Sequence, residues 1–264
     1  MEILRKLRFE TLPLSLSGVI LGILLAAADY MVDWKVAVAL LAATSLLHLS
    51  INAGKYGKED GHMRKVSQLF LALTIICGVL TVYFTFGTLL LMESFVVMLL
   101  GYVIIRTARH SDFFNATQTL SRKFVPVLLL TALVPIYGSY YICSHSFGTW
   151  LLLLPSLAVG ALNLAIVREG AVLEVDKEAT YSFKIVQFLL IMVSWLAMTA
   201  FTLLRVYDIW HYLFVASMPL FVAYRIVFMK NGSAHKQISF KLLLASSLLF
   251  STMGGLGYVI FLLR

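Results

Sequence analysis

The chain alternates long apolar runs with short polar stretches. The runs are close to the roughly 20 residues that a helix needs to cross a bilayer. They predict nine membrane-spanning helices, at Thr11–Ala28, Val36–Ala53, Val66–Phe86, Leu89–Ile105, Phe124–Cys143, Thr149–Val167, Ser182–Leu204, Tyr212–Met229 and Phe240–Leu263. The expected architecture is therefore an all-α integral membrane protein with a single multi-pass domain over residues 1–264.

Composition agrees with this pattern. Hydrophobic residues are 61% of the chain and charged residues 13%, against about 45–50% and about 25% in soluble domains. A soluble core, a fibrous repeat, a disordered tail and a disulfide scaffold are excluded as classes. Cys77 and Cys143 lie inside apolar runs, where we expect them to pack as small apolar side chains.

The net charge of +8 is explained by orientation in a bilayer and not by nucleic acid. With nine helices, 18 of the 21 lysine and arginine residues fall on one side and three on the other. Cytoplasmic loops are enriched in these residues, so we expect the N-terminus in the cytoplasm and the C-terminus outside. The first run is interpreted as a retained helix, because it has span length and eight more runs follow.

Three loops on the basic side are long enough for local structure, at residues 54–65, 106–123 and 168–181. The second helix leads into the first of them through Asn52, Lys55, Tyr56 and Lys58. Three glycines in eight residues are expected to break the helix there, and lysines with exposed backbone N–H groups suit an anion such as diphosphate. The alternative is an ordinary positively charged loop at a helix end.

The sixth helix carries Asn163 and then Arg168 and Glu169. A polar Asn163 within a span costs free energy unless it is paired, so we expect it to face the bundle interior. Glu174 and Glu178 are four residues apart and would share one face of a helix. This acidic stretch either binds a divalent cation or pairs with Lys55 and Lys58 of the other loop.

Two further patterns concern packing and depth in the membrane. Gly18 and Gly22 are four residues apart, a spacing that allows close contact with another helix. Aromatic residues are predicted near the outer ends of spans, where they suit the membrane interface; they are Trp34, Trp150, Trp210 and Tyr212.

Several short segments resemble the UbiA superfamily of intramembrane prenyltransferases. The closest branch looks like the menaquinone-pathway enzymes that prenylate 1,4-dihydroxy-2-naphthoate. Residues 8–14 resemble that branch's Arg-Pro-x-Thr-Leu-Pro-Leu entry to the first helix. Tyr56-Gly57 stands where the branch has Asn-Asp-Tyr-x-Asp, residues 138–141 resemble its Gly-Ser-Trp-Tyr, and Leu162-Asn163 resembles the Leu-Asn that leads into its second motif.

The resemblance implies a nine-helix bundle in a bacterial plasma membrane, around a membrane-embedded cavity that opens beside Asn52 and Asn163. It also implies transfer of a prenyl group from an isoprenyl diphosphate to an aromatic acceptor in quinone biosynthesis. The cofactor would be Mg²⁺, held by two aspartate-rich motifs, which stabilises the charge that grows on the leaving diphosphate.

The aspartate motifs differ here. Both aspartates of the first motif fall on Lys55 and Lys58, and the second motif falls on Ala165, Glu169 and Leu173. If the chemistry is kept, the diphosphate or cavity residues are expected in the set Asn52, Lys55, Tyr56, Lys58, Asn163 and Arg168. The candidate metal ligands are Glu169, Glu174, Glu178, Glu59 and Asp60.

Three functional interpretations remain open. The first is a prenyltransferase whose basic residues Lys55, Lys58 and Arg168 hold the diphosphate directly. The second is a non-catalytic homologue that binds an isoprenoid or quinone-like lipid, or a partner protein in the membrane. The third is a small transporter, which would need polar residues in matched broken helices of two half-repeats. The pattern favours the first two, and oligomeric state is left open.

Overall fold

A computed structural model describes residues 7–57, 60–88, 92–110, 125–175, 180–205, 209–230 and 233–262 of the chain. In this part of the chain every regular element is helical. The chain begins with the short helix η1 (Phe9–Thr11) and continues through long helices; these are α2 (Leu12–Asp29), α3 (Trp34–Tyr56), α4 (Gly61–Phe86), α5 (Met92–His110), α7 (Val134–Ser144), α8 (Leu153–Val175), α9 (Tyr181–Arg205), α10 (Met218–Phe228) and α11 (Ser233–Leu262).

Three of the long helices are preceded by a segment of different winding. The π-helix η2 (Leu129–Leu133) runs into α7, and the 3₁₀ segments η3 (Trp150–Leu152) and η4 (Ile209–Ser217) run into α8 and α10. With these segments, eight helices are long and apolar enough to cross a membrane. The apolar part of α5, Met92–Ile105, is shorter. A multi-pass membrane protein is thus confirmed, while α5 as a ninth span stays a prediction.

Helix ends follow from local sequence. Asp33 and Asp60 cap α3 and α4, because their carboxylates accept hydrogen bonds from the backbone N–H of Lys35 at 2.9 Å and of His62 at 3.0 Å. Such capping satisfies backbone donors that the first helical turn leaves unpaired. Gly87 ends α4 with a φ of 71°, a left-handed conformation that glycine adopts without steric cost.

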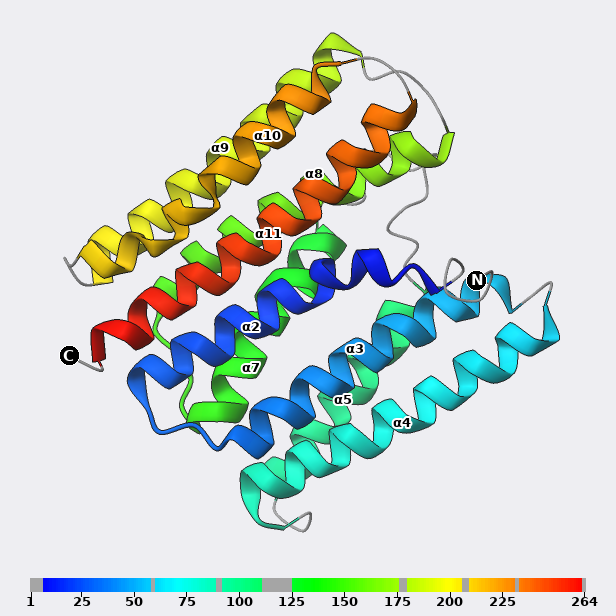
Figure 1. The fold of residues 1–264 in the computed structure, drawn as a ribbon. Coiled ribbons are helices and arrows are strands. Elements are labelled where there is room, and N and C mark those ends of the chain that lie inside the picture. The colour runs from blue at the N-terminus through cyan, green and yellow to red at the C-terminus, as the bar shows by residue number, and fades with distance from the viewer. Residues whose placement is uncertain are drawn as a thin grey trace.

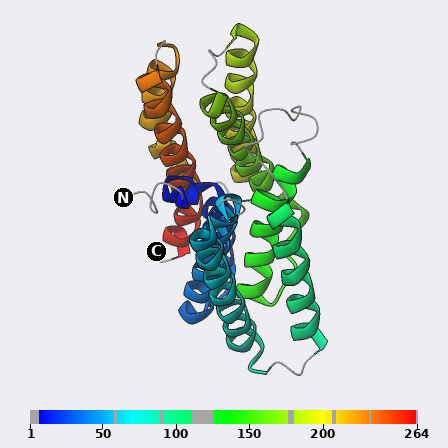
Figure 2. The ribbon, with the colours of Figure 1, turned by 90° about the vertical axis from the view of Figure 1, so that its right-hand side faces the viewer.

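The axes of the helices are roughly aligned along an elongated bundle (Figures 1 and 2). At one end α3 finishes, while α2, α4 and α11 begin; we call this the basic end, because Lys55, Arg64 and Lys236 lie there. At the opposite end α2 finishes at Asp29 and α3 begins at Trp34.

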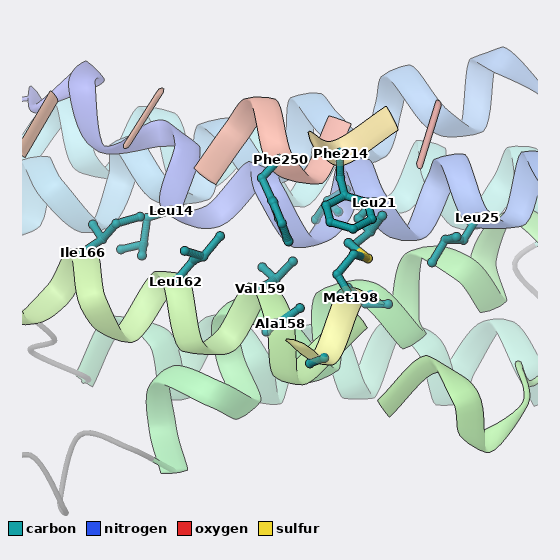
Figure 3. Close-up of a cluster of buried hydrophobic side chains, with 14 of the residues drawn as sticks. Leu14, Leu21, Leu25, Ala158, Val159, Leu162, Ile166, Met198, Phe214 and Phe250 are labelled. Carbon is teal, nitrogen blue, oxygen red and sulfur yellow. The ribbon is translucent and has the colours of Figure 1, made fainter. Parts of the chain in front are cut away.

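Three helices form the centre of the bundle, with 61% of the span buried for α2, 72% for α8 and 56% for α11. Their apolar side chains meet those of α9 and η4 in one core, where Leu21, Leu162, Met198 and Phe250 lie in the layer between the helices (Figure 3). By contrast, α4 is 17% buried and packs mainly against α3. Its exposed apolar side chains fit contact with lipid.

The close helix contact predicted at Gly18 and Gly22 is confirmed. A Cβ at Gly18 would lie 2.9 Å from the Thr131 carbonyl oxygen, and one at Gly22 would lie 2.5 Å from the Ile136 carbonyl oxygen. Only glycine allows the backbones of α2 and of the η2–α7 segment to approach this closely.

Candidate functional site

Arg168 and Glu169 are helical residues and not loop residues. The expectation of a polar loop over residues 168–181 was wrong at its start, because α8 continues to Val175. The side chain of Glu169 is only 5% exposed. Its polar contacts inside the bundle stabilise the extra helical turns that the run of charged residues had seemed to end.

The carboxyl group of Glu169 lies where four helices meet. The Tyr224 hydroxyl of α10 donates to Oε2 at 2.9 Å, the Gln187 amide of α9 donates to the same oxygen at 3.3 Å, and the Ser239 hydroxyl of α11 donates to Oε1. We call these four residues the Glu169 hub. All three donors are 1% exposed, so the carboxyl is hydrogen-bonded on both oxygens and shielded from water.

The sequence analysis missed the three partners of Glu169. Gln187 is a polar residue inside a predicted span, which is the signal that had singled out Asn163. Tyr224 and Ser239 carry no such signal, because tyrosine and serine are common in membrane helices. Only the packing of α10 and α11 against α8 brings them to the carboxyl.

Arg168, the neighbour of Glu169, has a different environment. Its guanidinium lies over the ring of Phe183 in α9, 4.5 Å from the centroid, a cation–π arrangement. Its Nη1 atom is buried and has no hydrogen-bond partner among the described residues. Arg168 therefore presents an unused donor close to the Glu169 hub.

The loop expected over residues 54–65 is also shorter than predicted. α3 continues through Gly54 and Lys55 to Tyr56, and α4 begins at Gly61. Gly54 does not break α3, because a Cβ added there would lie 3.2 Å from the Ser67 hydroxyl of α4, and the helix ends only at Gly57. This close approach of two helices stabilises the helical turn and outweighs the low helix propensity of glycine.

Asn52 is buried and connects the N-terminal segment to α3 by hydrogen bonds. Its amide donates to the Leu7 carbonyl at 3.0 Å and approaches the Thr11 hydroxyl at 3.4 Å. The Thr11 hydroxyl also lies 2.8 Å from His48 Nε2, while His48 Nδ1 lies 3.1 Å from the Ser15 hydroxyl. Both ring nitrogens of His48 are thus hydrogen-bonded within the protein.

Asn163 faces the bundle interior as expected and is 0% exposed. Its amide nitrogen lies 3.1 Å from the Leu14 carbonyl of α2 and 3.1 Å from the Thr131 carbonyl of η2. Pro135 follows Thr131 by four residues and has no N–H to offer that carbonyl. The Asn163 side chain therefore supplies the Thr131 carbonyl with a donor that position 135 cannot give.

Both asparagines contact residues 7–14: Asn52 bonds the Leu7 carbonyl, and Asn163, near the middle of α8, bonds the Leu14 carbonyl. In both, the amide nitrogen is already committed to backbone carbonyls. Lys55 and Tyr56 are exposed at the end of α3. The membrane-embedded cavity predicted beside the asparagines stays a prediction.

The predicted ion pair between the two loops is not formed by Lys55 and Glu169. In the described part of the chain, the Glu169 carboxyl contacts only the three hub donors as polar partners. The other residues of this prediction, Lys58, Glu174 and Glu178, lie outside the side chains that the structure describes, as does Glu59 of the candidate metal ligands.

The described residues do not fit the donor set of a magnesium–diphosphate site. Mg²⁺ is usually bound by one or two carboxylates together with phosphate oxygens and water. Both oxygens of Glu169 accept hydrogen bonds inside the bundle, and Asp60 Oδ1 caps α4. Within the described ranges no three His, Cys, Asp or Glu side chains gather as ligands.

A second polar cluster, also missed by the sequence analysis, lies at the end of the bundle opposite the basic end. Arg205 of α9 forms an ion pair with Asp29 of α2, and the Tyr140 hydroxyl of α7 donates to Asp29 at 2.6 Å. The Arg205 guanidinium also lies 5.1 Å from the ring centroid of Tyr258 in α11. Arg205 and its contacts thus connect α9, α2, α7 and α11.

Comparison with known proteins identifies no relative by family model or by similarity to curated proteins. No protein-family model matches the sequence, and no curated protein is significantly similar to it.

Proposed function

We propose that the protein is a UbiA-like membrane protein that binds an isoprenoid or quinone-like lipid without catalysing magnesium-dependent prenyl transfer. The basic end would face the cytoplasm of a bacterial cell, with the chain in the plasma membrane. The resemblance of the short motifs supports the layout and the lipid class, and the eight long apolar helices agree with it.

A single observation carries the non-catalytic part of the proposal. Glu169 stands where the resemblance puts a metal-binding acid of the second motif, and its carboxyl accepts hydrogen bonds from Gln187, Tyr224 and Ser239. A metal ion would have to displace these donors and leave buried hydroxyl and amide groups unpaired, which is costly. The first motif also disfavours a bound cation, because the positively charged Lys55, exposed at the end of α3, stands where the resemblance puts an aspartate.

Purified protein in lipid nanodiscs tests the proposal with two assays. In the first, farnesyl diphosphate and 1,4-dihydroxy-2-naphthoate are supplied with Mg²⁺, and we expect no prenylated product. In the second, the binding of farnesyl diphosphate and of a short-chain menaquinone is measured with Mg²⁺ and with EDTA. We expect at least one of the two lipids to bind, with an affinity that EDTA does not change.

Two results would contradict the proposal. Turnover at ordinary enzyme rates that disappears with EDTA would make the protein a prenyltransferase. Failure of both lipids to bind under either condition would favour a protein partner in the membrane. A Glu10→Ala variant serves as the control for nonspecific effects, because Glu10 is exposed and its Lys241 contact is long, at 4.0 Å.

A further inference from the structure

The basic end carries two positive charges on the outer side of α9 and α10. Lys184 lies in the first turn of α9 and is half-buried, while Arg225 lies in the last turn of α10 and is exposed. In the described part of the chain neither side chain lies within ion-pair distance of a carboxylate, whereas Arg205 at the other end is paired with Asp29. The two charges are therefore available to an anion from outside the chain.

The helices α9 and α10 pack as antiparallel neighbours along one edge of the bundle (Figure 1). The ring centroids of Phe183 and Phe228 lie 6.4 Å apart, and those of Trp195 and Phe221 lie 5.7 Å apart. Because residue numbers rise along α9 while they fall along α10, the start of α9 meets the end of α10. The two positive charges therefore lie at the same level of the bundle.

At this level each helix has one side toward the Glu169 hub and another toward the outside. Gln187 of α9 and Tyr224 of α10 donate to the buried Glu169 carboxyl. The next residue along each helix, Phe188 or Arg225, is exposed, since 3.6 residues per turn rotate it to another side. The Arg225 guanidinium lies over the Phe188 ring, 5.5 Å from its centroid, a cation–π contact that holds it against α9.

Lys184 shares this outer surface. It precedes Phe188 by four residues, and side chains at that spacing are neighbours on one face of a helix. Lys184 and Arg225 therefore both lie beside the Phe188 ring. We call these three residues the α9–α10 basic patch.

The side chains around the α9–α10 basic patch are apolar. Ile185 and Leu189 of α9 and Val222 and Ile226 of α10 are all exposed. On membrane-spanning helices such side chains contact the acyl chains of lipids, which are equally apolar. A ligand that fits this surface has an anionic group for the two cations and an acyl chain for their neighbours.

The depth of the patch in the bilayer agrees with the level of lipid head groups. α9 has 25 residues and is about 37 Å long at roughly 1.5 Å per residue, while the hydrocarbon core of a bilayer is about 30 Å thick. A helix of this length extends past the hydrocarbon at both ends, which brings Lys184 to the boundary between acyl chains and phosphates. The long side chain of Arg225 reaches the same boundary from one turn inside α10.

An anionic phospholipid fits these features better than other anions. A soluble phosphate ester has no chain for the apolar surface. A zwitterionic lipid carries its own cation beside the phosphate and gains less from two basic side chains. Basic residues at the cytoplasmic ends of membrane helices attract anionic lipids in general, and here two of them lie beside one aromatic ring.

We propose that the α9–α10 basic patch binds one anionic phospholipid of the surrounding leaflet. Its phosphate accepts hydrogen bonds from the Arg225 guanidinium and the Lys184 ammonium group, and an acyl chain lies against Phe188 and the apolar side chains beside it. The patch is on the outer surface, so this proposal goes beyond the proposed function and does not depend on what the bundle interior binds.

Native mass spectrometry of the full-length protein in a neutral detergent tests the proposal, because it resolves individual bound lipids. The dissociation constant of the first bound lipid is measured for phosphatidylglycerol and for phosphatidylcholine with the same acyl chains. We expect phosphatidylglycerol to bind roughly 25-fold more tightly, about fivefold for each basic side chain. Glycerol 3-phosphate, which has the phosphate without the chains, should not displace it.

Variants locate the site. Lys184→Gln combined with Arg225→Gln is expected to remove the preference for phosphatidylglycerol, and Arg225→Gln alone to reduce it about fivefold. Arg225→Lys keeps the charge and should keep most of the preference. If the double variant does not fold, the comparison of Arg225→Gln with Arg225→Lys decides.

The matched control is Arg64→Gln combined with Lys65→Gln. These residues are exposed in the first two turns of α4 at the same basic end, so the same two charges are removed. They are adjacent in the sequence and point to different sides of their helix. The control should leave the preference for phosphatidylglycerol nearly unchanged.

Three results would overturn the proposal. They are equal affinities of the wild-type protein for the two lipids, an equal loss of preference in the two double variants, and displacement of phosphatidylglycerol by glycerol 3-phosphate. The second would mean that the overall positive charge of the basic end attracts the lipid, and the third that a soluble anion occupies the patch. Each leaves the proposed function intact, because that function is tested with farnesyl diphosphate and menaquinone.

Discussion

The amide of Asn163 lies 3.1 Å from the carbonyl oxygen of Thr131, to which Pro135, four residues later, has no N–H to donate. This relationship joins α8 to the π-helical turn η2 that leads into α7. The same Asn163 amide lies 3.1 Å from the Leu14 carbonyl of α2. One buried side chain thus connects three spans.

Replacing Asn163 with alanine should destabilise the bundle, because it leaves the Thr131 and Leu14 carbonyls without this donor. We expect a loss of about 1–3 kcal/mol in the free energy of unfolding, measured by denaturation in mixed micelles. Ser156→Ala is the control at a similarly buried place in α8; its hydroxyl donates to Leu152 within the helix. Equal effects of the two variants would contradict the connecting role of Asn163.

Gly22→Ala tests the contact of α2 with α7. The added Cβ would lie 2.5 Å from the Ile136 carbonyl and would also meet the Ser139 hydroxyl, so a backbone has to shift. Overpacking of this kind costs about 1–3 kcal/mol, seen as a lower melting temperature in detergent.

Gly138→Ala provides the comparison for Gly22→Ala. A Cβ at Gly138 meets nothing within 4 Å, and alanine has the higher helix propensity, by up to about 1 kcal/mol. We expect an unchanged or higher melting temperature. A similar loss in both variants would show that helix composition, and not the α2–α7 contact, sets the effect.

Glu169→Ala should be among the most destabilising single changes in the basic half of the bundle. It removes the acceptor of Tyr224, of Ser239 and of one Gln187 N–H, while the Gln187 amide keeps the Ala165 carbonyl at 2.9 Å, and we expect a cost of about 2 kcal/mol or more. Tyr224→Phe removes one donor and keeps the other two, so its cost should be smaller, about 1 kcal/mol. Chemical denaturation of both variants gives the comparison; a larger loss for Tyr224→Phe would argue against a carboxyl-centred hub.

The effect of Mg²⁺ on the melting temperature is an independent test of the Glu169 carboxyl. Because the Glu169 carboxyl is engaged by protein donors, millimolar Mg²⁺ should not raise the melting temperature of the wild-type protein more than that of Glu169→Gln. A rise specific to the wild type would indicate a metal site at Glu169 and would weaken the proposed non-catalytic function.

Cysteine labelling decides whether α5 crosses the membrane. After replacement of Cys77 and Cys143, single cysteines are placed at exposed positions near helix ends, namely Lys35, Arg64, Glu93 and Gln237. With nine spans, an impermeant maleimide added outside intact cells should label positions 35 and 93 and not 64 and 237. If α5 does not cross, position 237 moves to the outer side, because an odd number of spans then separates it from position 64.

Much of this architecture could be predicted from the sequence. A membrane span is set by the length of an apolar run, a local property, and the observed helices follow the predicted runs closely. Gly18 and Gly22 predicted a close helix contact, because small residues let backbones approach. Asn163 predicted an interior position, because a polar side chain is costly to expose to lipid. The ends of α3 and α8 were misjudged, because charged residues and glycines at a helix end signal a loop only when no tertiary contact holds the helix.

The candidate site depended on tertiary structure. From the sequence, Glu169 is one of several acidic residues predicted near a membrane surface. In the structure its carboxyl accepts hydrogen bonds from Gln187, Tyr224 and Ser239 of three other helices. Likewise, Ser246 and Ser247 are adjacent and chemically identical, yet only the first hydroxyl is engaged by its own helix. The sequence determined which segments enter the membrane, because burial in lipid depends on each segment alone. The partners of each polar group were decided only by the packing of helices that lie far apart along the chain.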